Sequence, residues 1–201
     1  VGPCRNNPQG GANTPAMTFW GEAMAGGRPG ADFDLPIDLV AARDWYGRAA
    51  ALGDPWAEYG LSQILLASDG GPVDANGAQA ALERAAAAGL PVAARALADL
   101  LLPIDPERSA AIATDPGRAR SLYLAAADAG DAWASFRLGE LAAATGDGAT
   151  AKYRFEAAAG AGLPAAERAL ARLYQIGNAV PRDPQLAAQL FASAAAAGEE
   201  P

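Results

Sequence analysis

The sequence predicts an all-α protein, an α/α solenoid of about five helical hairpins, and three observations lead to this prediction. Alanine is the commonest of the 201 residues and β-branched residues are few, which favours helix. Five alanine-rich segments end in a glycine, at intervals of 36, 41, 32 and 36 residues, which is the spacing of solenoid repeats. An aspartate stands fifteen residues before each of these glycines. The glycines are Gly53, Gly89, Gly130, Gly162 and Gly198, and the aspartates are Asp38, Asp74, Asp115, Asp147 and Asp183.

The helix that ends at each glycine, called helix B of its hairpin, is defined at both ends. The aspartate is expected to be its N-cap, and the glycine suits the left-handed position after a helix. Between them, small and aromatic residues recur in steps of four, three and four residues, which places them on one helical face. That face consists of an alanine (Ala42, Ala78, Ala119, Ala151, Ala187), a large residue (Tyr46, Leu82, Tyr123, Phe155, Phe191) and an alanine pair near the end.

A second helix, helix A, follows each of the first four glycines. Its apolar positions lie four, eight and eleven residues after the glycine, for example Ala57, Leu61 and Ile64. Proline at the second residue, as in Pro55, suits the first turn of a helix, where the missing N–H is not needed. An additional copy of helix A fits residues 14–25, with Trp20 in the place of the leucine.

The predicted organisation is a poorly ordered arm at 1–13 followed by a repeat domain at 14–198. The hairpins are 14–52, 54–88, 90–129, 131–161 and 163–197. One hairpin cannot bury its apolar face alone, so neighbouring hairpins must stack to form the core. The sequence shows no polar helix after the last hairpin, so we expect a longer protein, or a partner or second copy on that end.

The last hairpin resembles a Sel1-like repeat, a relative of the tetratricopeptide repeat. It has the apolar residues of both helices, the pair Tyr174 and Gly177, then Val180 and the capping Asp183. The other hairpins keep fewer of these residues. The resemblance implies a bacterial adaptor or scaffold with no shared active site, and favours the periplasm or cell envelope over the cytoplasm.

Composition leaves little for catalysis. The chain has no histidine and a single cysteine, Cys4, which excludes histidine-dependent catalytic triads, thiolate zinc sites and an internal disulfide. No phosphate-binding glycine loop occurs. The carboxylate pairs Asp32/Asp34 and Glu199/Glu200 remain, and such adjacent groups are usually solvated. We therefore expect no enzyme, no cofactor and no metal site.

The bulk charge and hydropathy restrict the partners. A net charge of −8 and an isoelectric point near 4.5 argue against a nucleic-acid binder, which needs a basic surface. No apolar run approaches the roughly 20 residues of a membrane span. Protein, peptide or glycan partners remain.

By analogy with tetratricopeptide arrays, partner contacts are expected at the third, sixth and tenth residues after each glycine, on the outward face of helix A. Trp56 and Trp133 could bind a partner or fill a seam between helices, and the sequence leaves these alternatives open. For Tyr59 and Phe136 packing is favoured, whereas Arg95 could bind a partner's carboxylate or pair with Asp99. The candidate residues are Trp56, Tyr59, Gln63, Arg95, Asp99, Trp133, Phe136, Glu140 and Arg172.

Taken together, the sequence predicts a non-catalytic scaffold for protein–protein interaction, which presents a concave helical groove to a peptide or protein. The alternative is a bacterial envelope module that binds peptidoglycan or another glycan through the same tryptophans.

Overall fold

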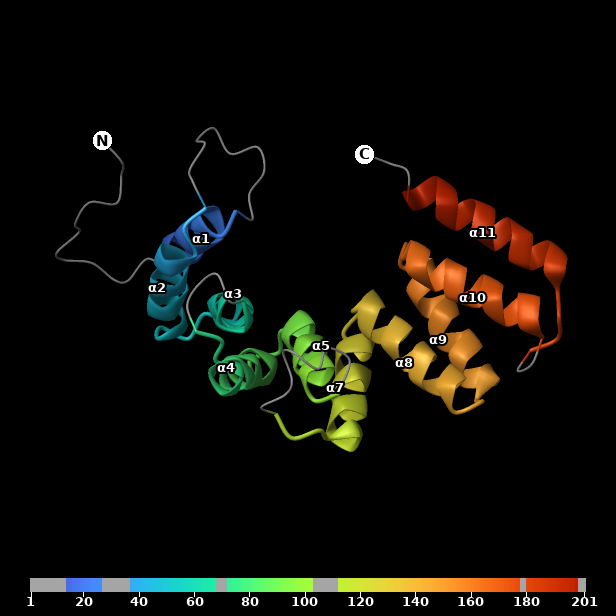
Figure 1. Ribbon diagram of the computed structural model, residues 1–201, viewed down its shortest axis with the longest axis horizontal. Helices are drawn as coiled ribbons and strands as arrows, with labels where there is room; N and C mark the ends of the chain where they lie inside the picture. Colours follow the sequence, from blue (N-terminus) through green and yellow to red (C-terminus); the bar gives the residue numbers. More distant parts are fainter. Residues whose placement is uncertain (1–13, 27–36, 68–71, 103–111, 178–179, 199–201) are drawn as a thin grey trace. The chain divides into compact units, whose positions relative to one another are not determined.

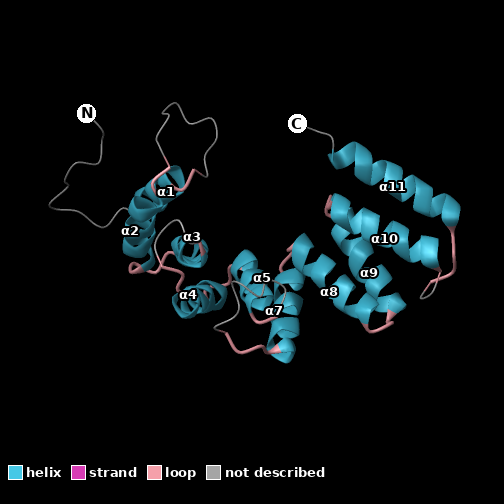
Figure 2. Cartoon of the chain, viewed as in Figure 1, coloured by secondary structure: helices cyan, strands magenta, loops and turns pink. Residues whose placement is uncertain are grey.

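A computed structural model describes residues 14–26, 37–67, 72–102, 112–177 and 180–198. Within these ranges the secondary structure is helix and connecting loop, with no strand (Figure 2). The N-terminal arm with Cys4 and the carboxylate pairs Asp32/Asp34 and Glu199/Glu200 lie outside the described residues.

The helices follow one another along the chain and pack sequentially as hairpins (Figure 1). Their bounds are α1 (Thr14–Met24), α2 (Leu39–Ala50), α3 (Pro55–Leu66), α4 (Ala75–Ala87), α5 (Pro91–Leu100), α7 (Pro116–Asp128), α8 (Ala132–Ala144), α9 (Gly148–Gly160), α10 (Pro164–Ile176) and α11 (Pro184–Gly198). The predicted all-helical solenoid of hairpins is confirmed. Helices α1, α3, α5, α8 and α10 are the A helices, and the other five of the described chain are B helices.

The chain divides into two compact units. Unit 1 comprises residues 1–93 and 103–113, and unit 2 comprises residues 94–102 and 114–201. Unit 1 therefore contains α1 to α4, and unit 2 contains most of α5 together with α7 to α11.

The predicted caps of the B helices are present. In each of the five, the backbone N–H three residues after the aspartate donates to its carboxylate, at distances of 2.8 to 3.1 Å. Gly53, Gly89, Gly130 and Gly162 have φ between 83° and 92°, as expected for a left-handed helix end. Gly198 differs, because it is the last residue of α11. The other four glycines each precede an A helix toward which the chain turns.

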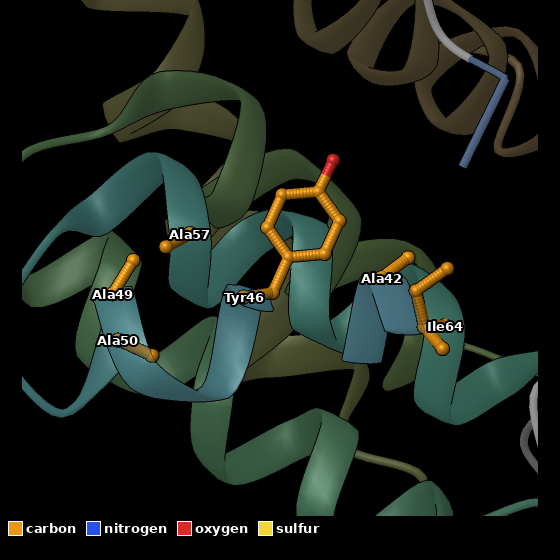
Figure 3. Close-up of a cluster of buried hydrophobic side chains, with 6 residues drawn as sticks. All are labelled: Ala42, Tyr46, Ala49, Ala50, Ala57 and Ile64. Atoms are coloured by element: carbon orange, nitrogen blue, oxygen red, sulfur yellow. The ribbon is translucent and has the colours of Figure 1, made fainter. Parts of the chain in front are cut away.

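The core of unit 1 forms around Tyr46, which extends from α2 among small side chains (Figure 3). A Cβ atom added at Gly21 of α1 would lie 2.7 Å from this ring, and one added at Gly60 of α3 would lie 2.6 Å from it. The ring therefore lies directly on the backbones of α1 and α3, which fixes these two A helices close to each other. The cluster consists of Ala42, Tyr46, Ala49, Ala50, Ala57 and Ile64.

Phe155 of α9 has the corresponding role in unit 2. A Cβ atom added at Gly139 of α8 would lie 2.6 Å from its ring. Phe155 packs with Ala142, Ala151 and Leu170 in one apolar cluster. The large residue of helix B and a small residue on the preceding helix A thus fit together in both units.

Candidate binding site

Two adjoining hollows lie in unit 1, where side chains of α1 and α3 meet. They share Glu22 and Trp56 as lining residues, and their volumes are about 470 and 260 Å³. The larger is lined by Pro15, Thr18, Phe19, Glu22, Asp54 and Trp56, and the smaller by Glu22, Ala25, Tyr46, Trp56, Tyr59, Gly60, Gln63 and Ile64. We call the two together the α1–α3 hollow.

Trp56 is the most prominent of these side chains. It is 55% exposed, an unusual exposure for an indole. Its ring and that of Tyr59 are nearly perpendicular in a T-shaped contact, with 6.3 Å between ring centroids and an angle of 88° between the ring planes. Pro55 starts the helix just before it, so the backbone at Trp56 is held in the first turn of α3. The backbone that carries the indole is therefore fixed at the start of α3, and about half of the residue is accessible to solvent.

Asp54 joins the two A helices at one end of the hollow. Its Oδ1 accepts the backbone N–H of Trp56 at 2.9 Å and caps α3. Its Oδ2 accepts the hydroxyl of Thr18 in α1 at 2.6 Å. Glu22, one turn further along α1, brings a second carboxylate to the lining. The described lining residues are thus mainly carboxylate, aromatic and apolar side chains.

The predicted candidates Trp56, Tyr59 and Gln63 all line this hollow. Prediction from sequence missed the residues that α1 contributes. Pro15, Thr18 and Glu22 are the third, sixth and tenth residues after residue 12, which takes the place of the repeat glycine in the first hairpin. The repeat register contained this signal, but residue 12 is alanine, so the glycine that anchored the count is missing there.

Arg95 and Asp99 lie within a polar cluster of unit 2. Arg95 Nε lies 3.1 Å from Asp131 Oδ2, and its Nη1 lies 3.7 Å from Asp99 Oδ2. Asp99 Oδ1 accepts the hydroxyl of Tyr123 at 2.6 Å and lies 3.4 Å from Nε of Arg137. Arg95 thus pairs with two carboxylates of its own chain, and its binding of a partner's carboxylate stays a prediction. We call these five residues the Asp99 cluster.

The cluster has a marked effect on Tyr123. Burial raises the pKa of its phenol well above the usual range, and the hydrogen bond to Asp99 raises it further. Tyr123 is fully buried, so its hydroxyl depends on this carboxylate as acceptor.

The remaining candidates are dispersed in unit 2. Trp133 is 47% exposed and meets Phe136 edge-on, with 5.6 Å between centroids. Phe136 is partly buried and also packs on Phe155, which agrees with the packing role favoured for it. Glu140 is exposed and accepts from Arg137 at 2.8 Å, and Arg172 is exposed on α10.

Two further properties bear on chemistry. Within the described ranges, no group of three or more Asp, Glu, Cys or His side chains is arranged to hold a metal ion. None of the helices described has both the length and the apolar character needed to cross a bilayer.

The helical hairpins and their register define an α-helical repeat protein. The Sel1 repeat pattern matches residues 14–54, 57–90, 107–131 and 164–199, which is more than half of the sequence, so the chain belongs to the Sel1 repeat family. The predicted family is confirmed. Proteins of this kind are generally non-catalytic scaffolds.

Solved bacterial structures share the fold. A protective antigen present in uropathogenic Escherichia coli strains, displaying an SLR fold, is 25% identical with a TM-score of 0.77; the match covers 92% of this chain and 38% of the antigen. A Sel1 repeat protein from Oxalobacter formigenes is 23% identical with a TM-score of 0.78, over 93% of this chain and 74% of that protein. No match was found among curated proteins.

Proposed function

We propose that this chain is a scaffold that binds a peptide or protein partner through the outward positions of its A helices, with Trp56 in the α1–α3 hollow as the main contact. The observation that supports this most is the convergence of the third, sixth and tenth positions of two successive A helices on one hollow. Tryptophan is among the residue types that contribute most binding energy at interfaces, and Trp56 is half-exposed beside a hollow.

The test compares the chain with its Trp56→Ala variant, each immobilised and exposed to a lysate of a bacterial host. A protein retained by the wild type is then purified and its Kd measured with both chains. We expect binding to the variant to be weaker by roughly tenfold or more. Trp45→Ala, on helix B, is the matched control and is expected to bind as the wild type does.

Equal affinity of wild type and Trp56→Ala, with unchanged helical circular dichroism, would contradict the proposed site. Trp133→Ala tests the corresponding position of unit 2 in the same assay. The nine predicted site residues stay a prediction until such data exist.

Glycan binding is a second proposal, supported by the polar side chains around the exposed indole. Glu22, Asp54 and Gln63 offer oxygen and amide groups beside Trp56, and sugar rings stack on such indole faces. This function would agree with the envelope location expected from the sequence. Titration with cell-wall muropeptides, followed by tryptophan fluorescence, tests it directly.

A further inference from the structure

Helix α10 of unit 2 has two arginines on its outward face. Arg168 and Arg172 are the sixth and tenth residues after Gly162, and both are exposed. Four residues of α-helix place the two side chains on the same side, with a rise of about 6 Å between them. Ala166 and Leu170, which are buried, lie on the opposite side of the helix. We call Arg168 and Arg172 the α10 arginines.

The α10 arginines differ from the charged residues at the same positions of the preceding A helices in unit 2. Arg95, at the sixth position of α5, lies 3.1 Å from a carboxylate oxygen of Asp131. Glu140, at the tenth position of α8, lies 2.8 Å from a guanidinium nitrogen of Arg137. Among the residues that the structure describes, neither of the α10 arginines forms an ion pair or a side-chain hydrogen bond. Their charges are thus available to a carboxylate of another molecule.

An exposed apolar side chain continues the same stripe of α10. Ile176, the last residue of the helix, follows Arg172 by four residues and is 68% exposed. A large aliphatic side chain with this exposure gains free energy when another molecule covers it. The outward side of α10 therefore offers two cations and then an apolar contact, at successive turns of one helix.

We infer that the α10 arginines bind an acidic peptide segment of the partner, in which carboxylates on alternate residues of an extended chain pair with the two guanidinium groups. This inference rests on the scaffold function proposed above and specifies the partner's chemistry at α10. An apolar residue two positions beyond the second carboxylate covers Ile176. Each guanidinium can bind its carboxylate through two parallel N–H donors.

The spacing of the α10 arginines fits a segment of this kind. In an extended chain, the side chains of alternate residues point to the same face, with about 6.7 Å between their Cα atoms. That distance is close to the rise of about 6 Å from Arg168 to Arg172. The chain has a net charge of −8, so most of its surface repels an acidic peptide. Binding of such a peptide therefore depends on the local charge of α10.

The probe is the peptide acetyl-Glu-Ala-Glu-Ala-Leu-amide, titrated into the ¹⁵N-labelled chain at low ionic strength. The side-chain Nε–H signals of the α10 arginines are followed, and each is assigned from its glutamine variant. We expect both signals to shift in a saturable way. The peptide with glutamine in place of both glutamates has the same shape without charge, and is expected to bind about tenfold more weakly. The peptide acetyl-Ala-Glu-Glu-Ala-Leu-amide keeps both charges on adjacent residues, which point to opposite faces, and is expected to bind about threefold more weakly.

Variants of the chain test the two arginines separately. Arg168→Gln and Arg172→Gln each remove one cation, and each is expected to weaken binding of the alternating glutamate peptide by about threefold. Arg154→Gln makes the same change of net charge on helix B α9, where Arg154 lies over the ring of Tyr153, and is expected to bind as the wild type does. Because the α10 arginines are exposed, their variants should keep the helical circular dichroism and the urea midpoint of the wild type.

Equal binding of the glutamate and glutamine peptides, equal binding of the alternating and adjacent glutamates, or no binding would overturn the inference. The same holds if acetate at twice the peptide concentration shifts the signals equally, or if muropeptides alone shift them. These outcomes are separable from failure of the scaffold function. If Trp56→Ala loses a captured partner and no acidic peptide binds α10, the scaffold holds and the acidic-segment site is wrong. If the peptide binds α10 and Trp56→Ala changes no partner's Kd, the acidic-segment site is present and the function proposed for Trp56 is wrong.

Discussion

Glu22 of unit 1 and Asp99 of unit 2 are carboxylates at the same position of the repeat, but their surroundings differ. Asp99 accepts a hydrogen bond from the buried Tyr123 and forms ion pairs with two arginines of its own unit, so its charge is balanced within the chain. Glu22 lines a hollow beside an exposed tryptophan. The caps, alanine positions and helix lengths of the two regions are alike. What differs is the side chains at two positions, which are Arg95 and Arg137 around Asp99 and Thr18 and Gly60 at the equivalent places near Glu22.

A related comparison concerns the junction between successive A helices. Where the residue after the repeat glycine is Asp54 or Asp131, the sixth position of the preceding helix A is a donor, Thr18 or Arg95. Where that residue is Leu163, the sixth position is Phe136, and both belong to one apolar cluster. At these three junctions the two positions are therefore both polar or both apolar, which avoids burying an unpaired polar group.

The largest expected effect comes from substituting the two glycines on which the large aromatic ring of each unit packs. Gly21→Ala and Gly139→Ala each place a Cβ atom within 2.7 Å of an aromatic ring, that of Tyr46 or Phe155. Such overpacking costs about 1 to 3 kcal/mol. We expect both variants to unfold at lower urea concentration by similar amounts, because the two contacts are equivalent.

Gly47→Ala provides the control, because a Cβ atom there meets nothing within 4 Å on helix α2. It is expected to stabilise the chain by about 0.5 to 1 kcal/mol through helix propensity. Stabilisation by Gly139→Ala as well would show that Phe155 does not lie on the α8 backbone.

The second largest loss of unfolding free energy is expected when the carboxylate of Asp99 is removed. Asp99→Ala leaves the buried hydroxyl of Tyr123 without its acceptor, and two arginines lose one of their partners. The expected loss is about 2 kcal/mol of unfolding free energy. Glu140→Ala, which removes an exposed pair with Arg137, is expected to cost less than about 0.5 kcal/mol. Equal losses in urea denaturation would contradict an internal role for Asp99.

The fold was predictable from the sequence because its determinants are local and repeated. An aspartate before a helix and a glycine after it act within a few residues, and the apolar steps mark the buried face directly. The same counting predicted that Trp56, Tyr59 and Gln63 share one face. The first helix A was predicted too, but its outward positions were not counted, since residue 12 is alanine and the count had no glycine to start from.

The polar contacts between repeats could not be derived in the same way. Arg95 has an evident partner four residues away in Asp99, whereas Asp131 is 36 residues away, one repeat further along the chain. A contact at this separation depends on how one hairpin packs on the next, which helical periodicity does not contain. The repeat register explains it afterwards, because Thr18 and Asp54 have the same separation.

Alkaline pH provides a graded test of the Asp99 cluster. Burial, and then the hydrogen bond to Asp99, raise the pKa of Tyr123 in the folded chain above its unfolded value of about 10. The resulting stability is therefore complete below about pH 10 and is lost as the pH rises further, by up to about 1.4 kcal/mol per pH unit. Tyr123→Phe should flatten this dependence in urea unfolding between pH 9 and 11. Tyr153→Phe, at a residue 63% exposed, should leave it unchanged.

The smallest expected effect concerns a pair that is complete in one unit and incomplete in the other. Glu58 of α3 is nearly buried and receives two hydrogen bonds from Arg84 of α4, at 2.6 and 2.8 Å. The equivalent residues of the last hairpin are Glu167 and Ser193, and Glu167 Oε2 is buried with no hydrogen-bond partner among the described residues. Ser193→Arg would restore the pair.

The side chain of Arg84 is 57% exposed, so solvent screens its interaction with Glu58. We therefore expect the equivalent pair made by Ser193→Arg to raise the free energy of unfolding by only about 0.5 kcal/mol. Ser193→Met, which lengthens the side chain without charge, separates the ion pair from simple packing. The gain should appear as a higher urea midpoint for the arginine variant alone, and it should vanish when Glu167→Gln is added. A gain that persists in the double variant would mean that the repeat register does not bring residues 167 and 193 together as it does residues 58 and 84.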